Sequence, residues 1–214
     1  MKAKALEQLD RSAEALEAYL LVVTTYADSE HAAPAMLEAA RLQETLGKKA
    51  EAIPLLRRLI QAYPEFKQLD AALYQLAWLL EEQGQAGEAG RLFERISEQY
   101  PGGTYWADTT YRLAERASRA GQYDRAKQFA ERLTEAECDP DILMHALYLR
   151  GQVAAFTQRW PEVAISLTAL LEQFPESPLR ATAECWIAEA LYQQKDYAAA
   201  SQWFARLEQE QLAE

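Results

Sequence analysis

Residues Leu69 to Pro101 read LDAALYQLAWLLEEQGQAGEAGRLFERISEQYP, and this stretch carries the pattern that decides the fold. Over its first half, apolar residues recur with the spacing i, i+3, i+4, i+7, which marks one face of an amphipathic helix. These residues are Leu73, Leu76, Ala77 and Leu80. Gly84 is expected to end that helix, because glycine readily takes the left-handed conformation of a helix C-terminus.

A second helix follows directly. Its predicted inner face carries Ala89, Leu92, Phe93 and Ile96. It should end at Tyr100, because Pro101 and the two glycines after it cannot continue a helix. The connection between the two helices is short, so they are predicted to be antiparallel neighbours.

This helix pair recurs along the chain with a spacing of 37 residues and no insertion or deletion. The repeated stations hold residues of one kind. One column is Ala15, Ala52, Ala89, Ala126, Val163 and Ala200; a second is Ala3, Ala40, Ala77, Ala114, Gly151 and Ala188; a third is Val22, Leu59, Ile96, Leu133, Leu170 and Leu207. An in-register repeat of this size indicates one supersecondary unit stacked on copies of itself.

The predicted fold class is therefore all-α: a right-handed α-solenoid of antiparallel helix pairs with about five to six repeats. The chain should form a single array whose units are approximately 1–29, 30–66, 67–103, 104–140, 141–177 and 178–214, the first of them truncated. Small residues are expected where helix backbones approach closely. Gly47, Gly84 and Gly121 stop the first helix of three units, and Asp10, Gln158 and Lys195 hold the same station elsewhere.

Several motifs resemble the tetratricopeptide repeat, and the similarity covers nearly the whole chain. They are Ala89-x-x-x-Phe93 followed by Pro101, Ala200-x-x-x-Phe204, Leu76-Ala77-x-x-Leu80, Leu113-Ala114 and Gly151. The chain departs from the family in two ways. The Trp that commonly opens the motif is replaced by Met36, Leu73, Thr110, Leu147 and Glu184, and the period is 37 rather than the usual ~34 residues.

The Tyr-Pro and Phe-Pro steps that close the second helices resemble those of the bacterial cell-envelope members of the family. Those members include outer-membrane assembly lipoproteins and the periplasmic partner of the Tol-Pal system. The resemblance favours the periplasm or cell envelope over the cytoplasm. The short first unit and the uncovered Trp203 and Phe204 in the last unit suggest a piece of a longer array, or pairing through the ends.

The resemblance implies that the first helices line a concave groove, and we expect a protein or peptide partner to bind there. The predicted groove residues are Leu37, Arg41, Tyr74, Trp78, Tyr111, Glu115, Tyr148, Gln152, Phe156 and Glu189. Tyr and Trp present rigid area with a hydrogen-bonding tip, which suits peptide binding. Two interpretations of the tyrosine column stay open: it contacts a partner, or it packs between neighbouring first helices.

Composition excludes other classes of function. The net charge of −11 repels polyphosphate, so nucleic acid is not expected as a partner. We expect no catalytic residues, metal or cofactor, because His31 and His145 lack ligand spacing and no phosphate loop or nucleophile motif occurs. No apolar run approaches the ~20 residues of a transmembrane helix. The function predicted is a non-catalytic interaction scaffold or adaptor, and the alternative is a self-associating structural array.

Overall fold

A computed structural model describes residues 1–211, with side chains through Glu208, and every regular element in that range is a helix. These helices are α1 (Lys2–Gln8), α2 (Ser12–Thr25), α3 (Ala32–Thr45), α4 (Lys49–Ala62), α5 (Leu69–Glu82), α6 (Ala86–Gln99), α7 (Trp106–Arg119), α8 (Tyr123–Thr134), α9 (Pro140–Phe156), α10 (Trp160–Gln173), α11 (Arg180–Gln193) and α12 (Tyr197–Gln211). The predicted fold class, a helical repeat solenoid, is confirmed. The last predicted unit, 178–214, extends beyond the described residues.

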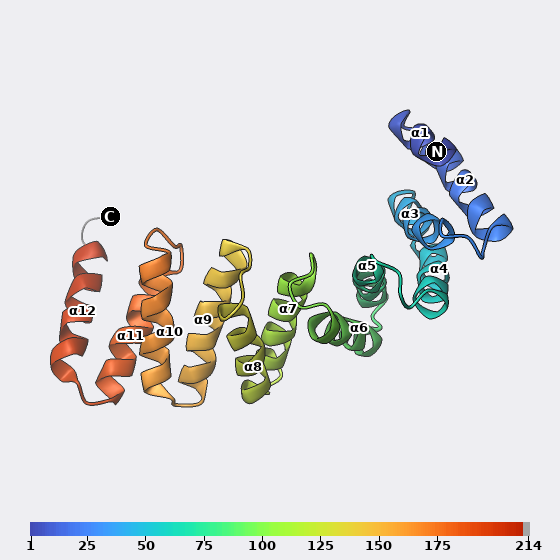
Figure 1. The fold of residues 1–214 in the computed structure, drawn as a ribbon. Coiled ribbons are helices and arrows are strands. Elements are labelled where there is room, and N and C mark those ends of the chain that lie inside the picture. Colours follow the sequence, from blue (N-terminus) through green and yellow to red (C-terminus); the bar gives the residue numbers. More distant parts are fainter. Residues whose placement is uncertain (212–214) are drawn as a thin grey trace. The chain divides into compact units, whose positions relative to one another are not determined.

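The chain divides into two compact units, Met1–Tyr105 and Trp106–Glu214. In the first, α1 to α6 pack one against the next in chain order, and in the second α7 to α12 do the same (Figure 1). The second unit also brings first helices together, since α9 contacts both α7 and α11. Each unit is thus a stack of helix pairs in which every inner helix packs against the helix before it and the helix after it.

The first helices end in one recurring turn. Gly47, Gly84 and Gly121 have φ of +75°, +75° and +71°, as the sequence predicts. The same conformation is taken by Asp10, Gln158 and Lys195, with φ between +56° and +66°. A side chain in this region costs roughly 1–2 kcal/mol, so these three turns have the same geometry as the glycine turns at a higher cost.

The second helices end where the sequence places a proline. Tyr63, Tyr100 and Phe174 each follow the last helical residue and precede a proline, and their ψ values of +50° to +68° lie outside the helical range. Steric contact with the proline ring disfavours the helical conformation at this position. The first and fourth units lack the proline; α2 of the first still has 14 residues, whereas α8 of the fourth has 12.

The columns of small residues lie in the core. Ala40, Ala77, Ala114 and Ala188 have no exposed surface, and Gly151 is buried. A Cβ atom at Gly151 would lie 2.6 Å from Cδ2 of Leu167. Helices α9 and α10 therefore approach too closely at this crossing even for alanine in the present geometry.

Two helices differ in length from their counterparts. α1 has seven residues and α9 has 17, whereas the other first helices have 14. α9 begins early because Asp139 caps it, accepting a hydrogen bond from the Asp141 amide at 2.9 Å, and because Pro140 fits the first helical turn.

Candidate partner-binding surface

All ten predicted groove residues lie on first helices. Leu37 and Arg41 are on α3, Tyr74 and Trp78 on α5, Tyr111 and Glu115 on α7, Tyr148, Gln152 and Phe156 on α9, and Glu189 on α11. The column one residue before the tyrosines points inward. Its members Met36, Leu73, Thr110, Leu147 and Glu184 are at most 3% exposed.

We call the next residues along these helices, Leu37, Tyr74, Tyr111 and Tyr148, the tyrosine column. All four are half-buried. Side chains at these stations border the core and retain a face toward solvent. The buried face fits packing beside neighbouring helices, and contact of the exposed face with a partner stays a prediction.

In the first unit, the aromatic residues of α5 form a cluster. The Tyr74 and Trp78 rings meet edge to face at 6.1 Å, and each also meets Phe93 of α6 at 6.2 Å. Phe93 is 3% exposed, so the cluster stands on the core. Tyr105, which sequence reasoning missed, stacks on Tyr74 with centroids 4.4 Å apart and 25° between the planes. We call Tyr74, Trp78 and Tyr105 the aromatic patch; all three are half-buried.

In the second unit, Tyr111 of α7 meets the His145 ring of α9 edge to face at 6.0 Å. The Tyr111 hydroxyl donates to Oε1 of Glu115 over 3.5 Å, and Arg119 pairs with the same oxygen at 3.1 Å. Burial, with a smaller contribution from the Glu115 charge, raises the pKa of Tyr111 to about 12. Its hydroxyl proton is directed to Glu115, and the hydroxyl oxygen can still accept a hydrogen bond.

The remaining predicted residues have neighbours of their own. Tyr148 packs on the core formed by α9, α10 and α11. Phe156 is 56% exposed and stacks on Tyr123, the first residue of α8, at 5.5 Å. The structure thus brings Phe156 to the preceding second helix. Glu189 accepts a hydrogen bond from Gln193 at 2.6 Å.

Arg41 belongs to a polar cluster with α1. Its guanidinium pairs with Glu38 at 2.8 Å and with Glu7, and the other oxygen of Glu7 accepts a 2.7 Å hydrogen bond from Tyr19. The hydrogen bond to Glu38 is the main reason that the pKa of Arg41 is raised. A ligand that engages Arg41 would have to compete with two carboxylates.

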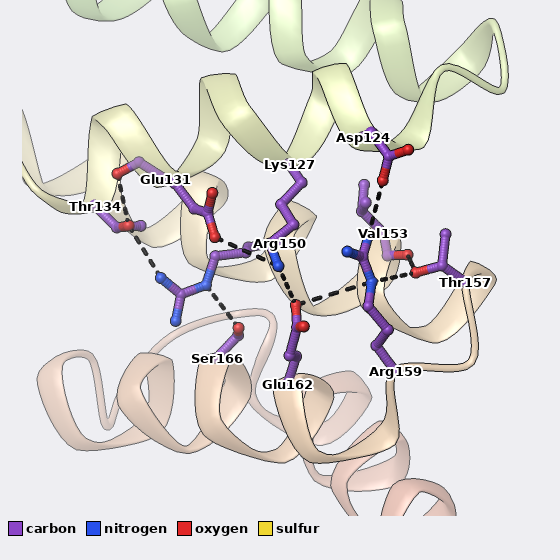
Figure 2. A network of polar contacts seen from close by, with 10 residues as sticks. All are labelled: Asp124, Lys127, Glu131, Thr134, Arg150, Val153, Thr157, Arg159, Glu162 and Ser166. Atoms are coloured by element: carbon purple, nitrogen blue, oxygen red, sulfur yellow. Dashed lines mark hydrogen bonds and ion pairs between the residues drawn. The ribbon is translucent and has the colours of Figure 1, made fainter.

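A second polar network, which the sequence did not reveal, joins α8, α9 and α10 (Figure 2). From α9, Arg150 donates through Nε to Ser166 at 2.7 Å and through Nη1 to Thr134 at 3.1 Å. Lys127 of α8 pairs with Glu162 of α10 at 2.7 Å. These contacts tie one repeat to the next, as the Lys49–Glu82 pair (2.7 Å) does in the first unit. The Lys49–Glu82 pair is exposed, and pairs of that kind contribute about 0–1 kcal/mol each.

The arrangement offers little for catalysis. Among the described residues, no group of three His, Cys, Asp or Glu side chains could hold a metal ion. The two histidines have ordinary neighbours: Nδ1 of His145 lies 2.7 Å from the Asp141 carbonyl, and exposed His31 lies 4.0 Å from Glu30. Nor does any helix in the described part of the chain have the length and apolar character needed to cross a membrane.

Comparisons with known proteins agree with this architecture. Sequence profiles of the tetratricopeptide repeat match residues 46–109 in one case, and residues 1–66 and 148–211 in another. The second profile alone covers more than half of the chain, so the protein belongs to the tetratricopeptide repeat family. Proteins of this family generally mediate protein–protein interactions, and the fold is typically a non-catalytic scaffold.

Solved structures of low sequence identity share the fold. YrrB, described as a TPR protein with an unusual peptide-binding site, has a TM-score of 0.63 at 16% identity over 90% of this chain and 91% of its own. The C-terminal part of a TPR repeat-containing protein from Cytophaga hutchinsonii has a TM-score of 0.61 at 17% identity, over 96% of this chain and 76% of its own. A tetratricopeptide repeat protein from Parabacteroides merdae has a TM-score of 0.61 at 13% identity, over 98% of this chain and 77% of its own. A search of curated proteins found no match.

Proposed function

We propose that this protein is a scaffold or adaptor that binds a peptide or protein segment on its first helices. The aromatic patch, Tyr74, Trp78 and Tyr105, is the observation that carries the proposal. Its rings stand on the buried Phe93 and are held by one another, so little conformational entropy is lost when a ligand covers them. Fixed, half-exposed aromatic residues of this kind are typical of interaction hot spots.

The groove residues of the second unit extend the same proposal. Tyr111, Glu115, Tyr148, Gln152 and Glu189 add hydroxyl, carboxylate and amide groups beside half-buried rings. Such a surface suits a ligand that has both apolar side chains and backbone or polar groups to pair. The general role of the family supports a protein or peptide as that ligand.

A peptide library displayed on phage, selected on the purified chain, would supply ligands for the test. We expect Trp78→Ala with Tyr105→Ala to weaken a selected peptide by about 2 kcal/mol, roughly thirtyfold, measured by calorimetry. The matched control is Tyr197→Ala, an aromatic residue that is 56% exposed on the second helix α12. Equal weakening by the control, or no effect of the double variant with helical content preserved, would show that the patch does not bind partners.

Self-association is a second candidate, and one observation favours it. Phe204 on α12 is 41% exposed, whereas its counterparts Tyr19, Leu56, Phe93, Ala130 and Leu167 are at most 7% exposed. A second copy could cover this residue. Sedimentation velocity at several concentrations, with Phe204→Gln as the comparison, would detect such a dimer, and a concentration-independent monomer would eliminate it.

We also propose a place in the bacterial cell envelope, on the support of the 37-residue period and the aromatic–proline steps at Tyr63, Tyr100 and Phe174. Fractionation of cells that produce the natural protein at its own level tests this. Recovery in the cytoplasmic fraction alone would eliminate an envelope role.

A further inference from the structure

In the two repeats formed by α3 to α6, charged side chains are divided unevenly between the first and the second helices. The first helices, α3 and α5, together carry five acidic residues and one basic residue. The second helices, α4 and α6, carry four acidic and five basic residues. α5, which holds Tyr74 and Trp78, has no basic residue. The excess of negative charge therefore lies on the helices beside the aromatic patch.

Part of this charge is neutralised within the chain. Arg41, the basic residue of α3, pairs with Glu38 and Glu7, and Lys49 of α4 pairs with Glu82. Three carboxylates on α3 and α5 form no ion pair with any residue that the structure describes, and all three are half-buried: Glu44, Asp70 and Glu81. A half-buried carboxylate attracts a cation more strongly than an exposed one, because water and salt screen it less.

One of these carboxylates lies at the N-terminal side of the aromatic patch. Asp70 is one turn before Tyr74 on α5, so the two residues are neighbours on the helix surface. A Cβ atom on Gly103 would lie 3.4 Å from Oδ2 of Asp70. Because Gly103 is two residues before Tyr105, the Asp70 carboxylate lies next to the connection that carries the third ring of the patch.

The other two carboxylates lie toward the C-terminal end of α5 and on the neighbouring first helix. Glu81 is three residues after Trp78, again a neighbouring position on the helix surface. Glu44 of α3 accepts a 2.9 Å hydrogen bond from the amide of Gln75, the residue that follows Tyr74. Carboxylates from two helices therefore flank the rings.

An aromatic surface flanked by carboxylates suits the side chain of a lysine or arginine. The aliphatic stem of such a side chain packs on the rings, and its cationic head pairs with a carboxylate. A neutral apolar side chain would gain the ring contacts alone, and an acidic one would be repelled. The charges therefore discriminate among ligands that the rings alone would accept.

We propose that the partner segment bound by the aromatic patch is a basic peptide, which places a lysine or arginine side chain on the rings with its charge at Glu44, Asp70 or Glu81. This inference rests on the proposed function, because it names the chemistry of the ligand at the same patch. The net charge of −11 adds a long-range attraction for a basic ligand, and this attraction raises the association rate at low salt.

Peptides selected on the full chain from the phage library are the probes. Those that Trp78→Ala with Tyr105→Ala weakens are the patch ligands, and we expect them to carry lysine or arginine. Asp70→Asn with Glu81→Gln removes two charges and keeps the shape of both side chains. Calorimetry should show that this variant binds the patch ligands about tenfold more weakly, with its helical content preserved in circular dichroism.

The matched control is Glu51→Gln with Glu98→Gln. These residues are exposed on the second helices α4 and α6, and the change in net charge is the same. Binding should stay within about twofold of that of the unsubstituted chain, because exposed charges away from the site are screened by salt. The comparison separates pairing at the patch from attraction to an acidic protein.

A change in the peptide completes a double-mutant cycle. Replacement of its lysine by norleucine, or of its arginine by citrulline, removes the charge and keeps the stem. This replacement should weaken binding to the unsubstituted chain about tenfold and have little effect on the chain with Asp70→Asn and Glu81→Gln. Higher ionic strength should likewise weaken binding to the unsubstituted chain more than to the variant.

The outcomes distinguish this inference from the proposed function. Patch ligands without lysine or arginine, or equal losses in the variant and the control, overturn the inference alone. Basic peptides that bind equally well after Trp78→Ala with Tyr105→Ala also overturn it, since they are attracted to the acidic chain and not to the patch. If no selected peptide is weakened by that double substitution, the proposed function fails as well.

Discussion

Replacement of Gly151 by alanine tests the closest helix crossing in the second unit. Within α9, alanine gains roughly 1 kcal/mol over glycine in helix propensity. The new Cβ atom, however, would lie 2.6 Å from Cδ2 and 2.7 Å from Cγ of Leu167, which has no exposed surface. Overpacking of this kind costs about 1–3 kcal/mol. The net expectation is a loss of about 0–2 kcal/mol in the free energy of unfolding.

A double-mutant cycle separates these two effects. Leu167→Ala alone should cost about 2–5 kcal/mol because it leaves a cavity. In that background the clashing carbon atoms are gone, so Gly151→Ala should become stabilising by about 1 kcal/mol or more. The expected signature is therefore a reversal of sign between the two backgrounds.

Urea unfolding followed by circular dichroism measures all four proteins. The transition of the unit that carries the substitution is compared, the second unit for Gly151 and the first for Gly87, because repeat arrays need not unfold in two states. Gly87→Ala in α6 is the matched control, since a Cβ there meets no atom within 4 Å and should stabilise by about 0.5–1 kcal/mol. If Gly151→Ala behaves like Gly87→Ala, or keeps its sign when Leu167 is shortened, the close approach of α9 and α10 is refuted.

Three further outcomes follow from single residues. Gln158→Gly should raise the free energy of unfolding by up to about 1 kcal/mol, because φ at this position is +56°. Gly84→Ala, at φ +75°, should lower it by about 1–2 kcal/mol. Urea unfolding measures both, and equal effects of the two substitutions would contradict the argument. Glu184→Leu should stabilise by about 1–3 kcal/mol, because one oxygen of this buried carboxylate has no hydrogen bond. Its partner Arg180, which pairs with the other oxygen at 3.1 Å, is 47% exposed and can be hydrated instead. A lower thermal midpoint would count against this expectation. The raised pKa of Tyr111 means that its phenol stabilises the fold fully below pH 10 and loses that contribution as the pH rises from 10 through about 12. Tyr111→Phe should therefore flatten the stability profile over that interval, and an unchanged slope would contradict the assignment.

Much of the fold could be predicted from local patterns. Glycine at Gly47, Gly84 and Gly121, and proline after Tyr63, Tyr100 and Phe174, set the helix ends through backbone sterics that act within a few residues. The early start of α9 was also readable, because Asp139-Pro140 is a cap followed by a proline at the first turn.

The candidate site was predictable only in part. Tyr74, Tyr111 and Tyr148 lie on first helices, next to the buried column, and their role in a groove stays a prediction. The stacking of Tyr105 on Tyr74 could not be predicted, because Tyr105 lies in a connection and its ring orientation depends on the neighbouring helix. The stacking of Phe156 on Tyr123 could not be predicted either, because Tyr123 comes from the preceding second helix, α8.

The sequence by itself determined the repeat, the helix ends and the inward column, since each depends on periodic or short-range properties of the chain. Only the tertiary structure decided which side chains from different helices meet. It joined Arg150 to Thr134 and Ser166 across three helices. It also formed a cleft among α1, α2 and α3. Contacts and cavities of this kind depend on the distance and rotation between packed helices, and these quantities are set by all the side chains at an interface together.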